Sequence, residues 1–98
     1  MIHQLYSVQD VRAGCYFQPY MFRNEGEALR TFEELANNPG SMICKYAEDY
    51  RMCLVGSFDD ETGEVFGGDA LVVAAAEQVR KDGPLEKPRM RVAAGKDQ

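Results

Sequence analysis

One amphipathic segment, residues 24–38, limits most strongly what this chain can fold into. Its apolar residues recur at three- and four-residue spacing, as on one face of an α-helix: Ala28, Leu29, Phe32, Leu35 and Ala36. Asn24 is a good N-cap, Glu27 completes the capping-box pattern, and Asn-Pro-Gly at 38–40 stops the helix. Because a chain of 98 residues has few apolar faces to spare, we expect this face to belong to the core.

The segments on either side of this helix have the composition of β-strands. Residues 2–8 and 15–22 precede it, and Pro19 implies that the second strand lies at an edge, is bulged or ends nearby. Residues 51–58 follow it and are apolar on both faces, which suits a central strand. An acidic turn containing Gly63 then leads into a return strand.

The region after the return strand is ambiguous. Gly67-Gly68-Asp69 predicts a break, residues 71–73 favour a strand, and residues 74–81 favour a helix. We expect a helix from about Leu71, with a strand start as the alternative. The order strand, strand, helix, strand, strand predicts one α+β domain over residues 1–79. This domain is a small, mostly antiparallel sheet with one helix packed on a face, followed by a C-terminal extension.

Charge divides the chain into two parts. Residues 1–79 contain five Lys/Arg and thirteen Asp/Glu, a net charge of −8, and residues 80–98 contain six and three, a net charge of +3. The acidic part repels phosphate and argues against a nucleic-acid footprint over the whole surface. We expect residues 80–98 to be a flexible basic tail, which either makes local phosphate contacts or is simply a solvated chain end.

Cysteine and histidine usage argues against thiol, disulfide and metal chemistry. Cys15, Cys44 and Cys53 form no C-x-x-C pair, and His3 is the only histidine. Four carboxylates at residues 59–64 suggest a solvated turn, with a weak divalent-cation site as the alternative. Nucleotide-binding and hydrolase motifs are absent from the sequence. We therefore expect no cofactor, no metal and no enzymatic activity.

Hydropathy indicates a cytosolic protein. No stretch of the sequence approaches the roughly 20 apolar residues of a membrane span. The first ten residues have no basic region followed by an apolar run, so we expect no signal peptide and no membrane association.

An ordered set of short segments resembles one protein family. The set consists of residues 2–8 (Ile-His-Gln-Leu-Tyr-Ser-Val), Asp10, Ala13-Gly14, Pro19, residues 27–32 (Glu-Ala-Leu-Arg-Thr-Phe), residues 38–41 (Asn-Pro-Gly-Ser), residues 48–50 (Glu-Asp-Tyr) and residues 55–63 (Val-Gly-Ser-Phe-Asp-Asp-Glu-Thr-Gly). Together they resemble the small nonstructural protein of gokushoviruses, which are tailless single-stranded-DNA bacteriophages of the microvirus group. The resemblance covers roughly residues 1–66 and does not extend to the alanine-rich segment or the basic tail.

The resemblance has consequences for function. It implies a protein made in the cytoplasm of the infected bacterium and absent from the mature virion. It also implies DNA binding and a role in genome replication, in the switch from duplex replicative DNA to single-stranded progeny genomes. No functional residues carry over from the family, because it has no agreed set.

Binding of single-stranded DNA requires basic groups along the phosphates and aromatic rings that stack on bases. Six basic candidates lie in the tail: Arg80, Lys81, Lys87, Arg89, Arg91 and Lys96. Three aromatic candidates lie on the second strand, where alternation places them on one face with Gln18: Tyr16, Tyr20 and Phe22. Packing under the helix is the alternative for these rings. Three further arginines flank the strands: Arg12, Arg23 and Arg51.

A second function class is a protein-interaction adaptor. Such an adaptor would bind a phage or host replication protein and affect DNA synthesis without contacting DNA. The net charge of −8 on residues 1–79 favours this class. A homo-oligomer formed through the aromatic edge strand is compatible with both classes, since edge strands invite pairing.

Overall fold

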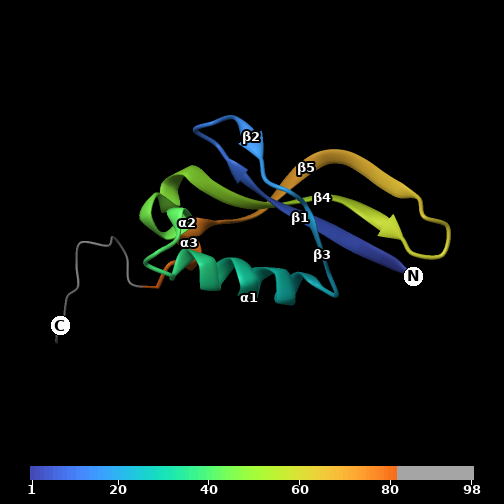
Figure 1. Ribbon diagram of the computed structural model, residues 1–98, viewed down its shortest axis with the longest axis horizontal. Coiled ribbons are helices and arrows are strands. Elements are labelled where there is room, and N and C mark those ends of the chain that lie inside the picture. The colour runs from blue at the N-terminus through green and yellow to red at the C-terminus, as the bar shows by residue number, and fades with distance from the viewer. Residues whose placement is uncertain (82–98) are drawn as a thin grey trace.

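The computed structural model describes residues 1–81, which form a five-stranded sheet and a set of helices (Figure 1). In chain order the elements are β1 (Ile2–Asp10), β2 (Cys15–Tyr16), β3 (Tyr20–Phe22), α1 (Glu25–Ala36), α2 (Met42–Lys45), the 3-10 turn η1 (Ala47–Asp49), β4 (Tyr50–Asp59), β5 (Val65–Ala75) and α3 (Ala76–Val79). Every strand pair among them is antiparallel. The protein therefore has the predicted α+β fold, with five strands instead of four.

The strand order is β2-β1-β4-β5, and β3 also pairs with β1. The strand β4 lies between β1 and β5, as its two apolar faces predict. The predicted second strand is divided into β2 and β3 around Pro19, which has no N–H to donate to the ladder. Phe17 lies opposite Val8 on β1, and Tyr20 lies opposite Tyr6. The chain therefore advances three residues between these two positions, whereas β1 advances two. This extra residue shifts the side-chain alternation by one position.

The helix α1 covers one face of the sheet and begins where its sequence predicts. The side chain of Asn24 accepts a hydrogen bond of 2.8 Å from the backbone N–H of Glu27. The predicted capping box is wrong in its second half, because the Glu27 carboxylate accepts from the backbone N–H of Arg23, at 3.2 Å, instead of from Asn24. The buried core joins α1 to β1, β4, β5 and the short helices: Tyr6, Ala28, Phe32, Ala36, Ile43, Ala47, Tyr50, Met52, Ala74 and Ala76.

The predicted helix from Leu71 is wrong. Strand β5 continues to Ala75, and α3 is a single turn that begins after it. Pairing with β4 decides this, because Ala74 lies opposite Met52 and both side chains are buried. A ladder that buries apolar side chains overrides the helix propensity of an alanine run. The predicted break at residues 67–69 is likewise wrong, since they form an irregular part of the same strand.

Two glycines shape the β4–β5 hairpin. Gly63 has φ +80° in the connecting turn, a backbone conformation that residues with a side chain rarely adopt. Gly56 approaches β5 so closely that a Cβ atom there would overlap the carbonyl oxygen of Phe66. The register between the two strands shifts beside Gly56. The irregular path of β5 therefore depends on the missing side chain at this position.

Candidate functional site

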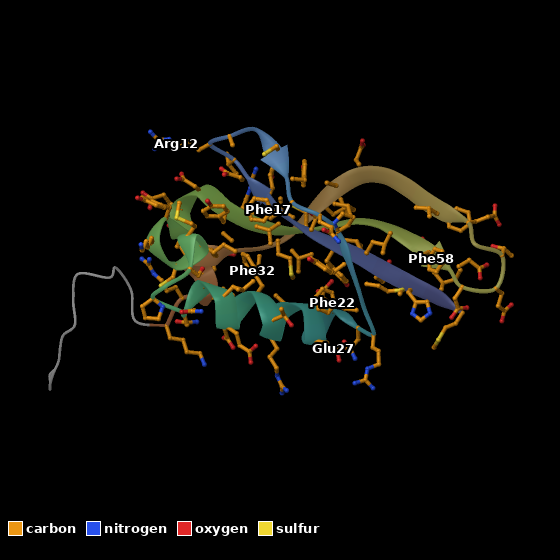
Figure 2. All side chains as sticks on the ribbon, viewed as in Figure 1. Arg12, Phe17, Phe22, Glu27, Phe32 and Phe58 are labelled. Atoms are coloured by element: carbon orange, nitrogen blue, oxygen red, sulfur yellow. The ribbon has the colours of Figure 1, made fainter. Side chains whose placement is uncertain are left out.

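An apolar pocket of about 320 Å³ opens between α1 and the β2–β3 edge of the sheet. Phe17, Tyr20 and Phe22 line it from the sheet edge, and Phe32 and Leu35 line it from α1. Figure 2 shows Phe22 and Phe32 between the helix and the sheet. The pocket is large enough for one aromatic ring or one apolar side chain and offers few polar groups to orient a substrate.

Two of the three predicted aromatic residues lie at this pocket. Phe22 packs edge-on against Tyr6, with ring centroids 6.0 Å apart and an interplanar angle of 65°. The Phe22 ring thus packs at the margin of the core. This is the alternative given above for these rings, in which they pack under the helix. Tyr20 is 59% exposed and leaves much of its ring open at the pocket.

The third aromatic residue, Tyr16, lies on the other face of the sheet, so the predicted shared face is wrong. The physical reason is the extra residue near Pro19, which shifts the side-chain alternation by one position. A proline predicts that a strand is interrupted, but not how many extra residues the interruption contains. Tyr16 lies opposite Gln9 on β1, and Gln9 lies opposite Arg51 on β4. The guanidinium Nη2 of Arg51 donates to Gln9 Oε1 at 3.0 Å. An aromatic ring, an amide and a guanidinium thus form a row across three strands.

A shallow hollow of about 440 Å³ lies beside this row, between the β2–β3 edge and the irregular part of β5. Tyr16 and Pro19 line one side of it, and Gly68 and Asp69 line the other. Tyr16 is 47% exposed, so its ring can accept a stacking partner. Arg12 lies exposed in the turn that joins β1 to β2.

The structure places the first two basic candidates against the folded body. Arg80 Nη1 donates to the carbonyl oxygen of Cys44 at 2.5 Å. The backbone N–H of Lys81 donates to Asn37 Oδ1 at 2.7 Å, and its ammonium lies 3.8 Å from the Glu33 carboxylate. These contacts fasten Arg80 to α2 and Lys81 to the C-terminal end of α1. The other four candidates, Lys87, Arg89, Arg91 and Lys96, lie outside the described residues.

The predicted acidic turn binds the start of the chain. Asp60 accepts hydrogen bonds of 2.7 Å from the Met1 ammonium and 2.8 Å from His3 Nε2. These two donors lower the pKa of the Asp60 carboxyl below its usual value. Across residues 1–81, no three His, Cys, Asp or Glu side chains are placed to hold a metal ion. No helix in that range is long and apolar enough to cross a membrane.

The fold is that of a small α+β protein with two surfaces suited to binding. One is the apolar pocket beside α1, and the other is the row of Tyr16, Gln9 and Arg51 on the opposite face of the sheet. Residues 3–78 match the family described as Phage ORF5 protein, so the chain belongs to that family. This membership confirms the phage origin implied by the sequence resemblance. Comparison with curated proteins and with solved structures finds no match.

Proposed function

We propose that this phage protein is a non-enzymatic factor that binds single-stranded DNA during viral genome replication. In this proposal it is the nonstructural protein of a gokushovirus, acts in the host cytoplasm and is absent from the virion. It favours the switch from duplex replication to single-stranded progeny synthesis by holding the displaced strand. The row of Tyr16, Gln9 and Arg51 on the sheet face opposite α1 is the observation that carries the proposal.

Each group in the row has a part in this proposal. The exposed ring of Tyr16 stacks on one base, a contact that tolerates any sequence. Arg51, at the other end of the row, and Arg12, in the turn that precedes β2, attract phosphates of the same strand. Because Arg80 and Lys81 are engaged with the body, the remaining tail cations supply the other phosphate contacts: Lys87, Arg89, Arg91 and Lys96. The acidic surface elsewhere repels the strand and confines it to this path.

Fluorescence anisotropy with labelled single-stranded and duplex oligonucleotides tests the proposal. Full-length protein should bind the single strand more tightly than the duplex. The six phosphate contacts, two from Arg12 and Arg51 and four from the tail, predict that raising salt from about 50 to about 200 mM weakens binding roughly 300-fold. Replacing the four tail cations with glutamine in the full-length chain should remove most of this salt dependence.

The stacking contact needs its own variant and control. Tyr16→Leu should weaken single-strand binding by roughly 5- to 150-fold, the range for loss of one stacked base. Tyr20→Leu is the matched control, because Tyr20 is 59% exposed and lies at the apolar pocket on the opposite face of the sheet, and it should leave binding unchanged. Folded protein that binds neither nucleic acid at low salt would refute direct DNA contact.

The apolar pocket beside α1 favours a second candidate function. In that case the protein is an adaptor, and the pocket accepts an apolar side chain of a phage or host replication protein. Thr31→Arg would place a long charged side chain at the pocket, where Thr31 now lies. If DNA binding fails, pull-down of the phage initiation protein by the wild type and its loss in Thr31→Arg would support the adaptor.

A further inference from the structure

We propose that the shallow hollow beside Tyr16 is a nucleobase site that selects guanine, and that the carboxylate of Asp69 is the selecting group. The hollow has a volume of about 440 Å³, which lies within the range of small-ligand sites. Figure 1 shows β2 and the arch of β5, which border it, on the side of β1 and β4 away from α1. The hollow is part of the DNA-binding face, so the inference rests on the function proposed above.

An irregularity of β5 brings Asp69 to this hollow. In the β4–β5 ladder, the single residue Val55 of β4 spans three residues of β5, 68–70. A bulge of this kind takes residues out of regular pairing and redirects a side chain, and bulges are common beside functional sites. Asp69 is the one charged residue of β5, is exposed and lines the hollow. The bulge thus adds a carboxylate to a site that also contains an aromatic ring.

The opposite wall of the hollow is held in place by hydrogen bonds to β1. The buried Ser7 hydroxyl donates to the carbonyl oxygen of Phe17 at 2.6 Å, and the backbone N–H of Phe17 donates to the carbonyl oxygen of Val8 at 2.8 Å. These bonds fix the segment between Tyr16 and Pro19 even though the proline interrupts the strand. The exposed ring of Tyr16 is therefore presented at a defined position, as a stacking site requires.

The chemistry of a carboxylate favours guanine over the other bases. Stacking accepts any base, so selection comes from the group that faces the edge of the base. An ionised carboxylate only accepts hydrogen bonds, and guanine has two adjacent donors, N1–H and N2–H, that match its two oxygens. Adenine and cytosine have a ring-nitrogen acceptor beside the amino group, and thymine has its N–H between two carbonyl oxygens. Each of these three bases would set an acceptor against Asp69, which disfavours its binding.

Charge orients the strand in the same sense. The Asp69 carboxylate repels phosphate, whereas Arg51 and Arg12 attract it. The strand should therefore enter with a base, and not with its backbone, toward Asp69. This orientation reconciles a carboxylate on the binding face with a nucleic-acid ligand.

Fluorescence anisotropy with full-length protein and a short thymidine oligonucleotide that contains one central guanine tests the proposal. This oligonucleotide should bind roughly 5- to 150-fold more tightly than those with adenine, cytosine or thymine at the same position, the range for one bidentate base contact. Deoxyinosine, which lacks the N2 amino group, should lose most of the preference, and 7-deazadeoxyguanosine, whose Watson–Crick edge is intact, should retain it. These changes of ligand test the contact without altering the protein.

A variant and its control assign the preference to Asp69. Asp69→Asn removes the charge, keeps the size of the side chain and should bind all four oligonucleotides with similar affinity. Glu34→Gln is the matched control, because it removes one exposed carboxylate from α1, on the other face of the sheet, and it should retain the preference. A guanine preference that persists in Asp69→Asn would overturn the proposal.

Loss of guanine selection and loss of DNA binding give different results. A wild type that binds the four oligonucleotides equally would overturn guanine selection and leave DNA binding in place. If no oligonucleotide binds, the proposed function fails, and the free nucleotides dGMP and dTMP then test the hollow by itself through the amide NMR signals of residues 68–70. Shifts with dGMP and not with dTMP would support a guanine site, and the absence of shifts would overturn it.

Discussion

Replacement of Phe32 by alanine should cost this protein a large share of its stability. Phe32 is 2% exposed and joins α1 to the sheet at the centre of the core. An aromatic side chain buries roughly 150–250 Å², which at about 25 cal/mol per Å² corresponds to about 4–6 kcal/mol. The Cβ atom remains and alanine favours a helix, so we expect a loss of about 3–4 kcal/mol in the free energy of unfolding.

Urea denaturation followed by circular dichroism measures this loss. The Phe32→Ala midpoint should fall with an unchanged m-value, and the melting temperature should fall by about 12–25 °C. Leu35→Ala is the control, because Leu35 lies on the same helix and pocket but is 39% exposed, and it should cost about 1 kcal/mol. A loss below about 1 kcal/mol for Phe32→Ala, or equal losses for both variants, would refute the packing of α1 described above.

Three further predictions concern the hairpin, the thiols and alkaline pH. Gly56→Ala should lower the free energy of unfolding by about 1–3 kcal/mol through backbone overlap, whereas Gly67→Ala, where a Cβ meets open space, should cost much less in the same urea titration. Iodoacetamide at pH 8 should label exposed Cys15 quickly and spare Cys53, whose thiol pKa is raised by burial; comparable mass-spectrometric labelling rates would contradict its position. Burial, and next the nearby carboxylate of Asp10, raises the pKa of Tyr50 above its usual 10.0. The protonated Tyr50 hydroxyl therefore makes its full contribution to the free energy of unfolding below pH 10, and this contribution is lost as pH rises through the pKa of Tyr50 in the folded protein. The urea midpoint should fall above pH 10, and it should fall less in Tyr50→Phe.

Local sequence signals determined much of the fold. The amphipathic period of residues 25–36, with Asn24 as its cap, specifies α1, because helix periodicity and capping depend on neighbouring residues alone. The division of the second strand at Pro19 and the turn at Gly63 follow from the backbone chemistry of those two residues. The two apolar faces of β4 likewise indicated its interior place in the sheet.

Tertiary structure decided what local signals leave open. The alanine-rich segment after Leu71 became strand as far as Ala75, because pairing with β4 buries side chains that an isolated helix would expose. The extra residue near Pro19 placed Tyr16 and Tyr20 on opposite faces, because the phase of a strand is set by its register with a neighbour. Arg80 belongs to the folded body for the same kind of reason: its hydrogen bond reaches Cys44, a residue distant in the sequence and adjacent only after folding.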